Sequence, residues 1–254
     1  MGKIIGGIQK EVNEDCPAVV SYFLAEKQSA PVIIVFPGGG YSHRAYHEGE
    51  PIAKWLNQHG FHACVVRYKV RPIEQQETIH QGLNMIQLVK QKMSEIPASQ
   101  DQKLGVLGFS AGGHLAAMIS NLAKPGQIDF QILCYPVITM GTGTHEGSRV
   151  NLLGADPTKI MIDRYSADKL VHPNTPPAFI WSTVNDASVS VMNCYLYAQA
   201  LQKNKIPYEL HLFPDGSHGL GLADDHFAVR QWRDLCINWL TNYRTDTTEE
   251  ERSE

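Results

Sequence analysis

The sequence predicts a single α/β domain, with a mostly parallel central sheet flanked by helices. Apolar runs rich in β-branched residues alternate with longer segments of helical periodicity, an order typical of parallel strands joined by helices. The chain has 254 residues, of which 43% are hydrophobic and 19% charged, so it can bury one large core. No repeat and no Gly/Ser-rich or Pro-rich linker divides it. Residues 1–244 are therefore expected to form one domain, followed by a polar and acidic tail over 245–254 that is expected to be disordered.

Seven apolar runs are the predicted strands. The first run is expected to be partly exposed, and the later ones have the continuous apolar character of strands buried on both faces of a sheet. In chain order they are 19–24, 32–36, 63–68, 104–107, 128–135, 178–181 and 208–213.

Helical periodicity fills the intervals between these runs. Pro51 stands at a first helical position and Gly60 follows the last one, which bounds the first helix. Apolar residues between Ile79 and Met93 recur at helical spacing and indicate a second helix. The predicted helices are 51–59, about 74–93, 111–124, 191–203 and 224–243.

One segment breaks the alternation of strands and helices. Residues 139–177 separate two predicted strands by far more than the roughly 4–6 residues of an ordinary loop, so we expect a functional or covering insert there. Residues 157–165 are predicted to form a short helix within it. Irregular turns are predicted around its glycines, Gly141, Gly143, Gly147 and Gly154.

Charge and cysteine usage exclude several classes of protein. A formal charge of −4 and a pI near 6.3 argue against nucleic acid or an anionic membrane as partners. No apolar run reaches the roughly 20 residues of a membrane span, and the first residues lack a secretory signal pattern, so a cytoplasmic location is expected. The cysteines are odd in number, scattered and without a C-x-x-C pair, which favours reduced thiols over disulfides or zinc. They are Cys16, Cys64, Cys134, Cys194 and Cys236.

The strongest motif is Gly-Phe-Ser-Ala-Gly at residues 108–112, a G-x-S-x-G pattern. It follows a predicted strand and opens a predicted helix, and this strand–turn–helix context is that of a nucleophile elbow. The turn places the hydroxyl of Ser110 at a helix N-terminus, where developing negative charge is stabilised. A glycine-rich turn packed tightly for steric reasons alone is the alternative interpretation.

A serine needs a base to activate it, and the base needs an acid to orient it. In hydrolases with this elbow, the acid and then the base follow the serine on loops after later strands. Asp186 comes directly after the strand at 178–181, and His218 directly after the strand at 208–213. Both are expected at the carboxyl edge of the sheet, beside Ser110. The sequence thus predicts a catalytic triad of Ser110, Asp186 and His218.

Other titratable residues suit these roles less well. His114 falls inside the helix after the serine and is expected to pack or to support the site. His211 lies within a predicted strand, and His226 within the last predicted helix. Asp215 is three residues from His218 and is too near in sequence to orient the far side of that ring.

A glycine loop supplies the other part of the predicted site. Residues 37–41 read Pro-Gly-Gly-Gly-Tyr and follow the strand at 32–36. Bare backbone amides of Gly39 and Gly40, with the amide of Ala111 after the nucleophile, are the predicted oxyanion hole. A phosphate-binding loop is the alternative, but no Gly-Lys-Ser/Thr follows.

Polar side chains after this loop are candidates for the rim of the pocket. His43 and His47 are four residues apart and close to two glutamates. The H-E-x-x-H order is absent, so no metal is predicted, and no cofactor is predicted because the Ser-Asp-His mechanism requires none. Tyr41 and His43 are instead candidate substrate-binding residues, and His145 and Arg149 are further candidates on the leaving-group side.

The chain resembles esterases of the α/β-hydrolase fold near the hormone-sensitive-lipase and acetylesterase groups, and most of all bacterial carbohydrate-acetylesterase-like proteins. It departs from them at Pro37, where many relatives have a histidine, and after Asp186, where a proline often follows within a few residues. The matching segments are FPGGGY at 36–41, GFSAGGHLA at 108–116, CYP at 134–136, NTPP at 174–177 and HGLGL at 218–222.

The resemblance implies a serine carboxylesterase that removes short acyl groups, acetyl above all, from small esters that include acetylated carbohydrates. The expected partner is a small-molecule ester, and a homo-oligomer is compatible with the sequence. Two alternatives stay open. The same triad serves a small-amide hydrolase or a peptidase-like enzyme, and the same fold serves non-catalytic binding proteins. The binding protein is less favoured because all three triad positions are filled.

Overall fold

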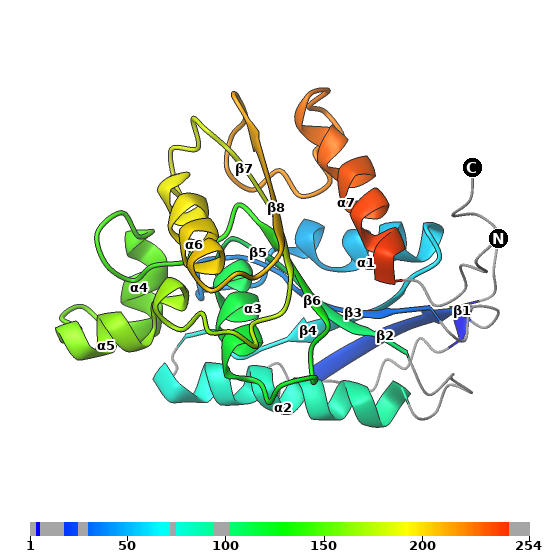
Figure 1. The fold of residues 1–254 in the computed structure, drawn as a ribbon, viewed down its shortest axis with the longest axis horizontal. Helices are drawn as coiled ribbons and strands as arrows, with labels where there is room; N and C mark the ends of the chain where they lie inside the picture. The colour runs from blue at the N-terminus through cyan, green and yellow to red at the C-terminus, as the bar shows by residue number, and fades with distance from the viewer. Residues whose placement is uncertain (1–3, 6–17, 25–29, 72–74, 94–101, 244–254) are drawn as a thin grey trace.

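The computed structural model describes residues 4–5, 18–24, 30–71, 75–93 and 102–243. Within these residues, eight strands form one sheet in the order β1-β2-β4-β3-β5-β6-β7-β8. β1 (Ile4–Ile5) is antiparallel to β2 (Ala18–Leu24), and β2 is antiparallel to β4. Every other pairing is parallel. The predicted mostly parallel sheet flanked by helices is confirmed (Figure 1).

The parallel strands follow the predicted apolar runs closely. Because Phe36 pairs with Gly108, and Cys134 pairs with both Phe109 and Trp181, the loops after four strands leave the sheet at one edge. That carboxyl edge is where α/β sheets place their ligands. The parallel strands are β3 (Val32–Phe36), β4 (His62–Arg67), β5 (Leu104–Phe109), β6 (Phe130–Cys134), β7 (Ala178–Thr183) and β8 (Tyr208–Phe213).

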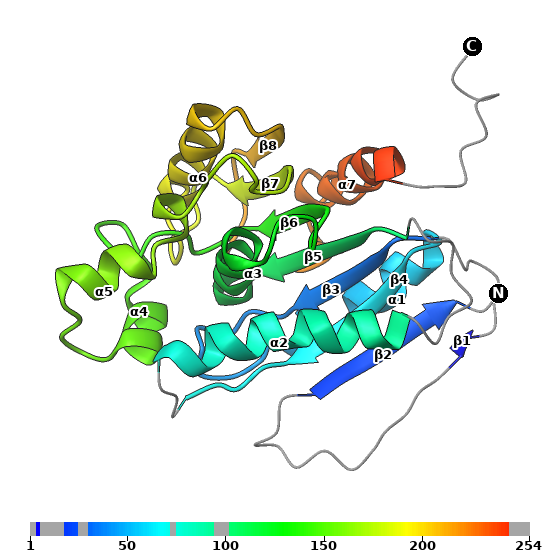
Figure 2. The same cartoon turned by 60° about the horizontal axis from the view of Figure 1, so that its bottom comes forward.

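Helices cover both faces of the sheet (Figures 1 and 2). α1 (Glu50–Gln58) and α7 (Trp232–Leu240) pack on one face. The other face carries α2 (Gln75–Met93), α3 (Ser110–Leu122) and α6 (Met192–Lys203). The insert supplies α4 (Glu146–Leu153) and α5 (Lys159–Arg164), which lie beyond the carboxyl ends of β3 and β5 in Figure 2. Short 3₁₀ turns are η1 (Tyr46–Glu48), η2 (Ala167–Lys169), η3 (Val229–Gln231) and η4 (Thr241–Tyr243).

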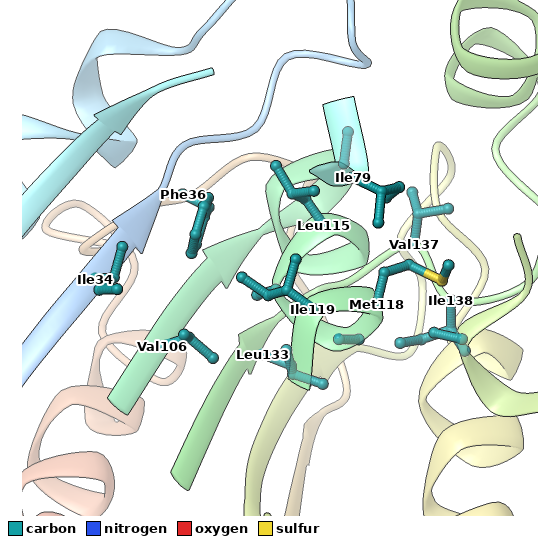
Figure 3. Close-up of a cluster of buried hydrophobic side chains, with 14 of the residues drawn as sticks. Ile34, Phe36, Ile79, Val106, Leu115, Met118, Ile119, Leu133, Val137 and Ile138 are labelled. Carbon is teal, nitrogen blue, oxygen red and sulfur yellow. The ribbon is translucent and has the colours of Figure 1, made fainter. Parts of the chain in front are cut away.

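The core has two halves because neighbouring residues of a strand point to opposite faces of the sheet. In β3, Ile33 packs against the α1 and α7 side, and Ile34 against the α2, α3 and α6 side. Figure 3 shows the second half, where Leu115 and Ile119 of α3 lie over Val106 of β5. Twelve of the thirteen residues of α3 are buried. The element that begins with Ser110 is therefore held on all sides by the core.

The last helix begins later than predicted. The sequence predicts a helix over 224–243, whereas α7 begins at Trp232, after η3. Turns at 224–225 and 227–228 stand in place of the first part of the predicted helix. Ala223 also has a left-handed φ of +55°, which a right-handed helix excludes. His226 consequently precedes α7 rather than lying within it.

The insert contains more helix than its glycines suggested. α4 stands where irregular turns are predicted, while α5 falls inside the predicted helix at 157–165. His145 caps the N-terminus of α4, and Gly154, with a φ of +88°, ends it. β1 is too short to show a period and is missed by the sequence analysis. The predicted tail at 245–254 and Cys16 lie outside the described residues.

Candidate active site

Ser110 occupies a sharp turn that joins β5 directly to α3. Its φ of +52° lies in the left-handed region, which non-glycine residues adopt rarely and which is enriched at functional sites. Neighbouring backbone passes close to the turn: a methyl group on Gly108 would lie 2.3 Å from the carbonyl oxygen of Gly112, and one on Gly112 2.1 Å from that of Phe36. Both glycines of the motif are therefore needed for their lack of a side chain.

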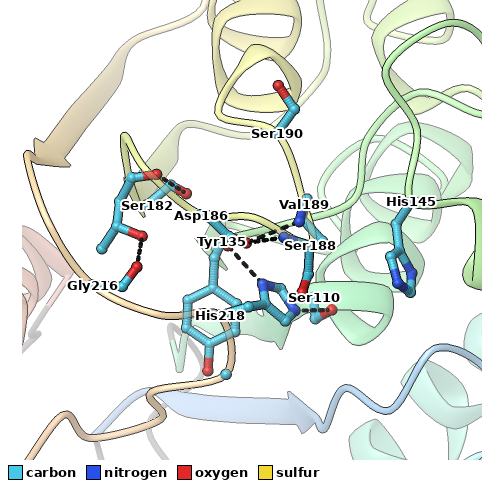
Figure 4. A network of polar contacts seen from close by, with 12 residues as sticks. Ser110, Tyr135, His145, Ser182, Asp186, Ser188, Val189, Ser190, Gly216 and His218 are labelled. Carbon is cyan, nitrogen blue, oxygen red and sulfur yellow. Dashed lines mark hydrogen bonds and ion pairs between the residues drawn. The ribbon is translucent and has the colours of Figure 1, made fainter.

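The structure brings the three predicted triad residues together (Figure 4). Nε2 of His218 lies 2.7 Å from Oγ of Ser110, and Nδ1 lies 2.7 Å from Oδ2 of Asp186. A carboxylate can only accept, so Nδ1 carries the ring proton and Nε2 is left to accept from the serine hydroxyl. This is the tautomer that a general base requires. Asp186 and His218 reach Ser110 from the loops after β7 and β8, as the strand-end argument predicts.

The Asp186 carboxylate is held on both of its oxygens. Oδ1 accepts hydrogen bonds of 2.9 Å from the backbone amides of Ser188 and Val189, while Oδ2 faces His218. The side chain is fully buried. Burial acts to raise the pKa of the carboxyl, but the hydrogen bonds from His218 and the two amides outweigh it, so the pKa of Asp186 lies below its ordinary value.

This lowered pKa predicts a loss of stability in acid. A carboxyl with a depressed folded-state pKa stabilises the fold above its unfolded pKa, and that contribution disappears as the pH falls toward the folded value. The difference in unfolding free energy between wild type and Asp186→Asn should be constant above about pH 5. It should shrink as the pH falls through 3.8, the ordinary value. Urea unfolding between pH 6 and 3 measures it, and a difference independent of pH would contradict the prediction.

The predicted oxyanion loop lies against Ser110. A methyl group on Gly38 would lie 3.0 Å from Cβ of Ser110. Gly39 and Gly40 have φ values of +122° and +61°, and within the described residues their amides donate to no protein group. Ala111 is in the first turn of α3, where backbone N–H groups lack intrahelical acceptors. Within the described residues, the amides of Gly39 and Gly40 are thus without a protein acceptor, and that of Ala111 lacks an intrahelical one.

Carbonyl oxygens of the loop are bound from three directions. The hydroxyl of Tyr68 donates to the oxygen of Pro37 at 2.6 Å, and Nδ2 of Asn151 in α4 donates to that of Gly40 at 2.7 Å. The amide of Arg71 donates to the oxygen of Tyr41 at 2.9 Å. These bonds fix the direction of the peptide planes, and the insert contributes one of them. Pro37 is therefore braced through its oxygen by Tyr68.

Two residues that the sequence analysis missed connect the loops of the site. Glu48, in η1, is buried, and its carboxylate accepts from the amide of Gly38 and from the hydroxyl of Tyr135. Tyr135 follows β6, and its ring packs edge-on against His218 with centroids 5.0 Å apart. The segment at 134–136 carried the only available signal for Tyr135. Glu48 lies in a polar stretch of the sequence, and no sequence feature distinguishes this buried glutamate from its exposed neighbours.

Tyr41 does not lie where the sequence analysis predicts. Its side chain is fully buried, and its hydroxyl lies 2.6 Å from Nδ1 of His114. The predicted substrate contact is corrected, because the ring belongs to the core and its polar atom is already bonded there. His43 is exposed, with Nδ1 3.0 Å from Oγ of Ser42, and its role in substrate binding stays a prediction.

His145 lies near the glycine loop with a defined tautomer. The amide of Ser148 donates to its Nδ1 at 3.2 Å, so the ring proton is on Nε2. A methyl group on Gly40 would lie 3.8 Å from Cε1 of His145, and Figure 4 shows the ring on the Ser110 side of the site. Burial, together with the nearby His218, lowers the pKa of His145 below its ordinary value. Arg149, the other leaving-group candidate, pairs with Glu146.

The competing residues occupy other positions, as the sequence analysis expects. His114 is fully buried, with Nε2 2.7 Å from the carbonyl oxygen of Tyr165, and burial lowers its pKa to about 4. Asp215 binds the side-chain amide of Asn185. His211 lies 3.0 Å from a carboxylate oxygen of Glu209 in β8. None of these contacts involves Ser110.

The residues that the structure describes, 4–5, 18–24, 30–71, 75–93 and 102–243, bear on metal binding and on membrane spans. That part of the chain contains no group of three or more His, Cys, Asp or Glu side chains placed to hold a metal ion. None of its helices has the length and apolar character needed to cross a bilayer.

The fold and this site define the class of protein. Residues 33–222 match the family described as alpha/beta hydrolase fold, and the chain belongs to that family. A solved structure of an acetyl ester-xyloside bifunctional hydrolase from Caldicellulosiruptor lactoaceticus is 40% identical, with a TM-score of 0.86 over 93% of this chain and 91% of that one. A carboxylesterase from Lactobacillus plantarum is 27% identical, with a TM-score of 0.77 over 88% of this chain and 92% of that one.

Two curated relatives are similar over most of this chain. An acetylxylan esterase from Xylanibacter ruminicola is 34% identical over 90% of this chain and 49% of its own length. An endo-1,4-beta-xylanase B from Butyrivibrio fibrisolvens is 36% identical over 83% of this chain and 36% of its own length. The chain thus spans half or less of the curated relatives it matches.

Proposed function

We propose that this chain is a serine carboxylesterase that hydrolyses short-chain acyl esters, acetyl esters above all, with acetylated carbohydrates as natural substrates. The observation that carries the proposal is the hydrogen-bonded series Ser110–His218–Asp186, together with a glycine loop whose Gly39 and Gly40 amides donate to no protein group among the described residues. A nucleophile, an oriented base and donors for an oxyanion are the three parts that acyl transfer needs. The substrate class comes from the relatives, which include an acetylxylan esterase.

The first half of the proposed reaction forms an acyl-enzyme. Nε2 of His218 takes the hydroxyl proton as Oγ of Ser110 attacks the ester carbonyl carbon, and the carbonyl electron pair moves onto the oxygen. The amides of Gly39, Gly40 and Ala111 stabilise that oxyanion. When the pair returns, the bond to the alcohol oxygen breaks and the alcohol leaves with the proton from His218.

Water completes the cycle by the same route. His218 takes a proton from the water molecule that attacks the acyl-enzyme, and a second oxyanion forms at the same donors. Collapse of this intermediate breaks the bond to Oγ of Ser110, which recovers its proton from His218. Asp186 keeps the imidazole in its tautomer and stabilises the imidazolium in both halves.

Acyl-chain length tests the proposed specificity. We expect kcat/KM to fall from p-nitrophenyl acetate to butyrate and octanoate, and we expect acetate to be released from acetylated xylo-oligosaccharides. Steady-state assays and quantification of free acetate provide the two measurements. Faster turnover of octanoate than of acetate would contradict the short-chain proposal. Absence of acetate release from the oligosaccharides would contradict the carbohydrate part alone.

We further propose that His145 donates a hydrogen bond to the leaving-group side of a sugar ester. Its Nε2–H has no protein acceptor within the described residues, and the ring stands next to Gly40. His145→Phe should lower kcat/KM for an acetylated xylo-oligosaccharide by about tenfold, the value of one hydrogen bond. His145→Gln, which keeps a donor, should lose less. p-Nitrophenyl acetate, which lacks sugar hydroxyls, is the reference substrate, and equal losses on both substrates would contradict this role.

The cysteines support a proposed cytoplasmic location. The four described ones, Cys64, Cys134, Cys194 and Cys236, are buried and unpaired. Burial raises the pKa of each thiol above its ordinary value, which keeps them protonated and unreactive. Thiols of this kind are typical of a reducing compartment. Fractionation of the native host, with immunodetection of the chain, distinguishes the cytoplasm from an exported location.

A further inference from the structure

Glu48 is a buried carboxylate at the centre of the site, and the proposed chemistry assigns it no step. Its side chain is 3% exposed. Oε2 accepts from the backbone amide of Gly38 at 2.7 Å, and Oε1 accepts from the hydroxyl of Tyr135 at 2.6 Å. Burial of a carboxylate costs free energy unless hydrogen bonds compensate for it. Its partners therefore indicate what the residue holds in place.

Tyr135 connects Glu48 to the base. Burial and the neighbouring carboxylate raise the pKa of the Tyr135 phenol well above its usual range, so the hydroxyl keeps its proton and donates it to Glu48. The same oxygen accepts from the amide of Gly221, on the loop that carries His218. The tyrosine ring also packs edge-on against His218, with an interplanar angle of 72°. Fixing this phenol therefore fixes both the ring and the loop of the base.

The other oxygen connects Glu48 to the oxyanion loop. Gly38 immediately precedes Gly39, and a methyl group on Gly38 would lie 2.6 Å from Oε2 of Glu48 and 3.0 Å from Cβ of Ser110. The carboxylate thus binds the loop at a residue that lies against the nucleophile. His47, the residue before Glu48, donates from Nε2 to the carbonyl oxygen of Gly219. This hydrogen bond is a second connection between η1 and the His218 loop.

We infer that Glu48 is a positioning residue that holds the oxyanion loop and the His218 loop in register. The inference rests on the proposed catalytic site, and it assigns to Glu48 no contact with substrate. Both partners are donors, so an ionised carboxylate satisfies both of them at once. A glutamine satisfies only one, because its NH₂ group must face a donor. Glu48→Gln is thus close to isosteric and breaks one side of the connection.

The test compares Glu48→Gln, Tyr135→Phe and the double variant with wild type on p-nitrophenyl acetate. Misplaced donors lower catalysis by about 10²-fold, so Glu48→Gln should lower kcat by about that factor. KM should stay within about threefold, since the displaced groups act mainly in the transition state. Tyr135→Phe should show a loss of the same kind, and the double variant should be less impaired than the product of the two single losses, because the residues act through one contact. Thermal unfolding of each variant shows whether it is folded.

Glu50→Gln is the matched control. Glu50 is two residues away and partly exposed, and its carboxylate binds Lys54 and Tyr46, so the variant should keep the kcat of wild type. A folded Glu48→Gln with a kcat within twofold of wild type would overturn the inference, as would multiplicative losses in the double variant. If Glu48→Gln fails to fold, Tyr135→Phe alone decides, since it removes only the hydroxyl. Full activity of Ser110→Ala would instead overturn the proposed site.

Discussion

Ser110→Ala is expected to lower kcat on p-nitrophenyl acetate by about 10⁴-fold or more, with little change in thermal stability. The hydroxyl oxygen becomes covalently bound to the acyl group in the proposed cycle, and among the described residues its hydrogen-bond partner is Nε2 of His218. Alanine removes that atom and leaves the turn intact. Residual hydrolysis is expected, because the oxyanion donors and His218 still act on water. Purified variants assayed side by side, with the unfolding midpoint of each, provide the measurement.

Ser120→Ala is the matched control for this experiment. Ser120 is a buried serine on the same helix, and its Oγ has no hydrogen-bond partner within the described residues. Its loss should leave kcat near that of wild type. If Ser110→Ala kept the activity of wild type, the proposed nucleophile would be wrong, and the amide-hydrolase and binding-protein alternatives would both need to be tested.

The elbow and the sheet are predictable because their signals are local. The strand before Ser110 is a continuous apolar run, and the helix after it is rich in apolar and small residues, as its burial requires. Both elements can therefore be recognised within a short window of sequence. Gly108 and Gly112 predict that neighbouring backbone passes close to the turn, and the structure shows this close approach. The positions of Asp186 and His218 follow from one further rule, that parallel strands end at a common edge.

The bracing of the site is not predictable in this way. Glu48 and Tyr135 are 87 residues apart in sequence and meet only when the sheet is assembled. The burial of Tyr41 depends similarly on His114, 73 residues away. Patterns within a short stretch of sequence carry no information on such distant pairs. A glutamate between polar neighbours is, from sequence alone, expected on the surface. α7 likewise begins later than the sequence predicts, since turns at residues 224–225 and 227–228 precede it.

Asp186→Asn is expected to lower kcat by about 10⁴-fold while Ser110 and His218 stay in place. The reason lies in the amides that bind Oδ1. Ser188 and Val189 both donate to that atom, so the asparagine must keep its oxygen there and turn its NH₂ group toward His218. Nδ1 then accepts instead of donating, and the ring proton moves to Nε2. A protonated Nε2 cannot take the proton from the Ser110 hydroxyl, so the base is lost although the geometry is kept.

Asp215→Asn distinguishes this explanation from a general loss of negative charge near the base. Asp215 is close to His218 in sequence, but its carboxylate binds the side chain of Asn185. Its replacement should leave kcat close to that of wild type, while Asp186→Asn should lose most activity and retain the fold. A larger loss for Asp215→Asn would transfer the acid role to Asp215 and contradict the triad. The amides of Ser188 and Val189 fix the orientation of the side chain at 186, so the tautomer explanation predicts a loss specific to Asp186. Equal and modest losses in the two variants would contradict it and would mean that His218 needs only a nearby anion.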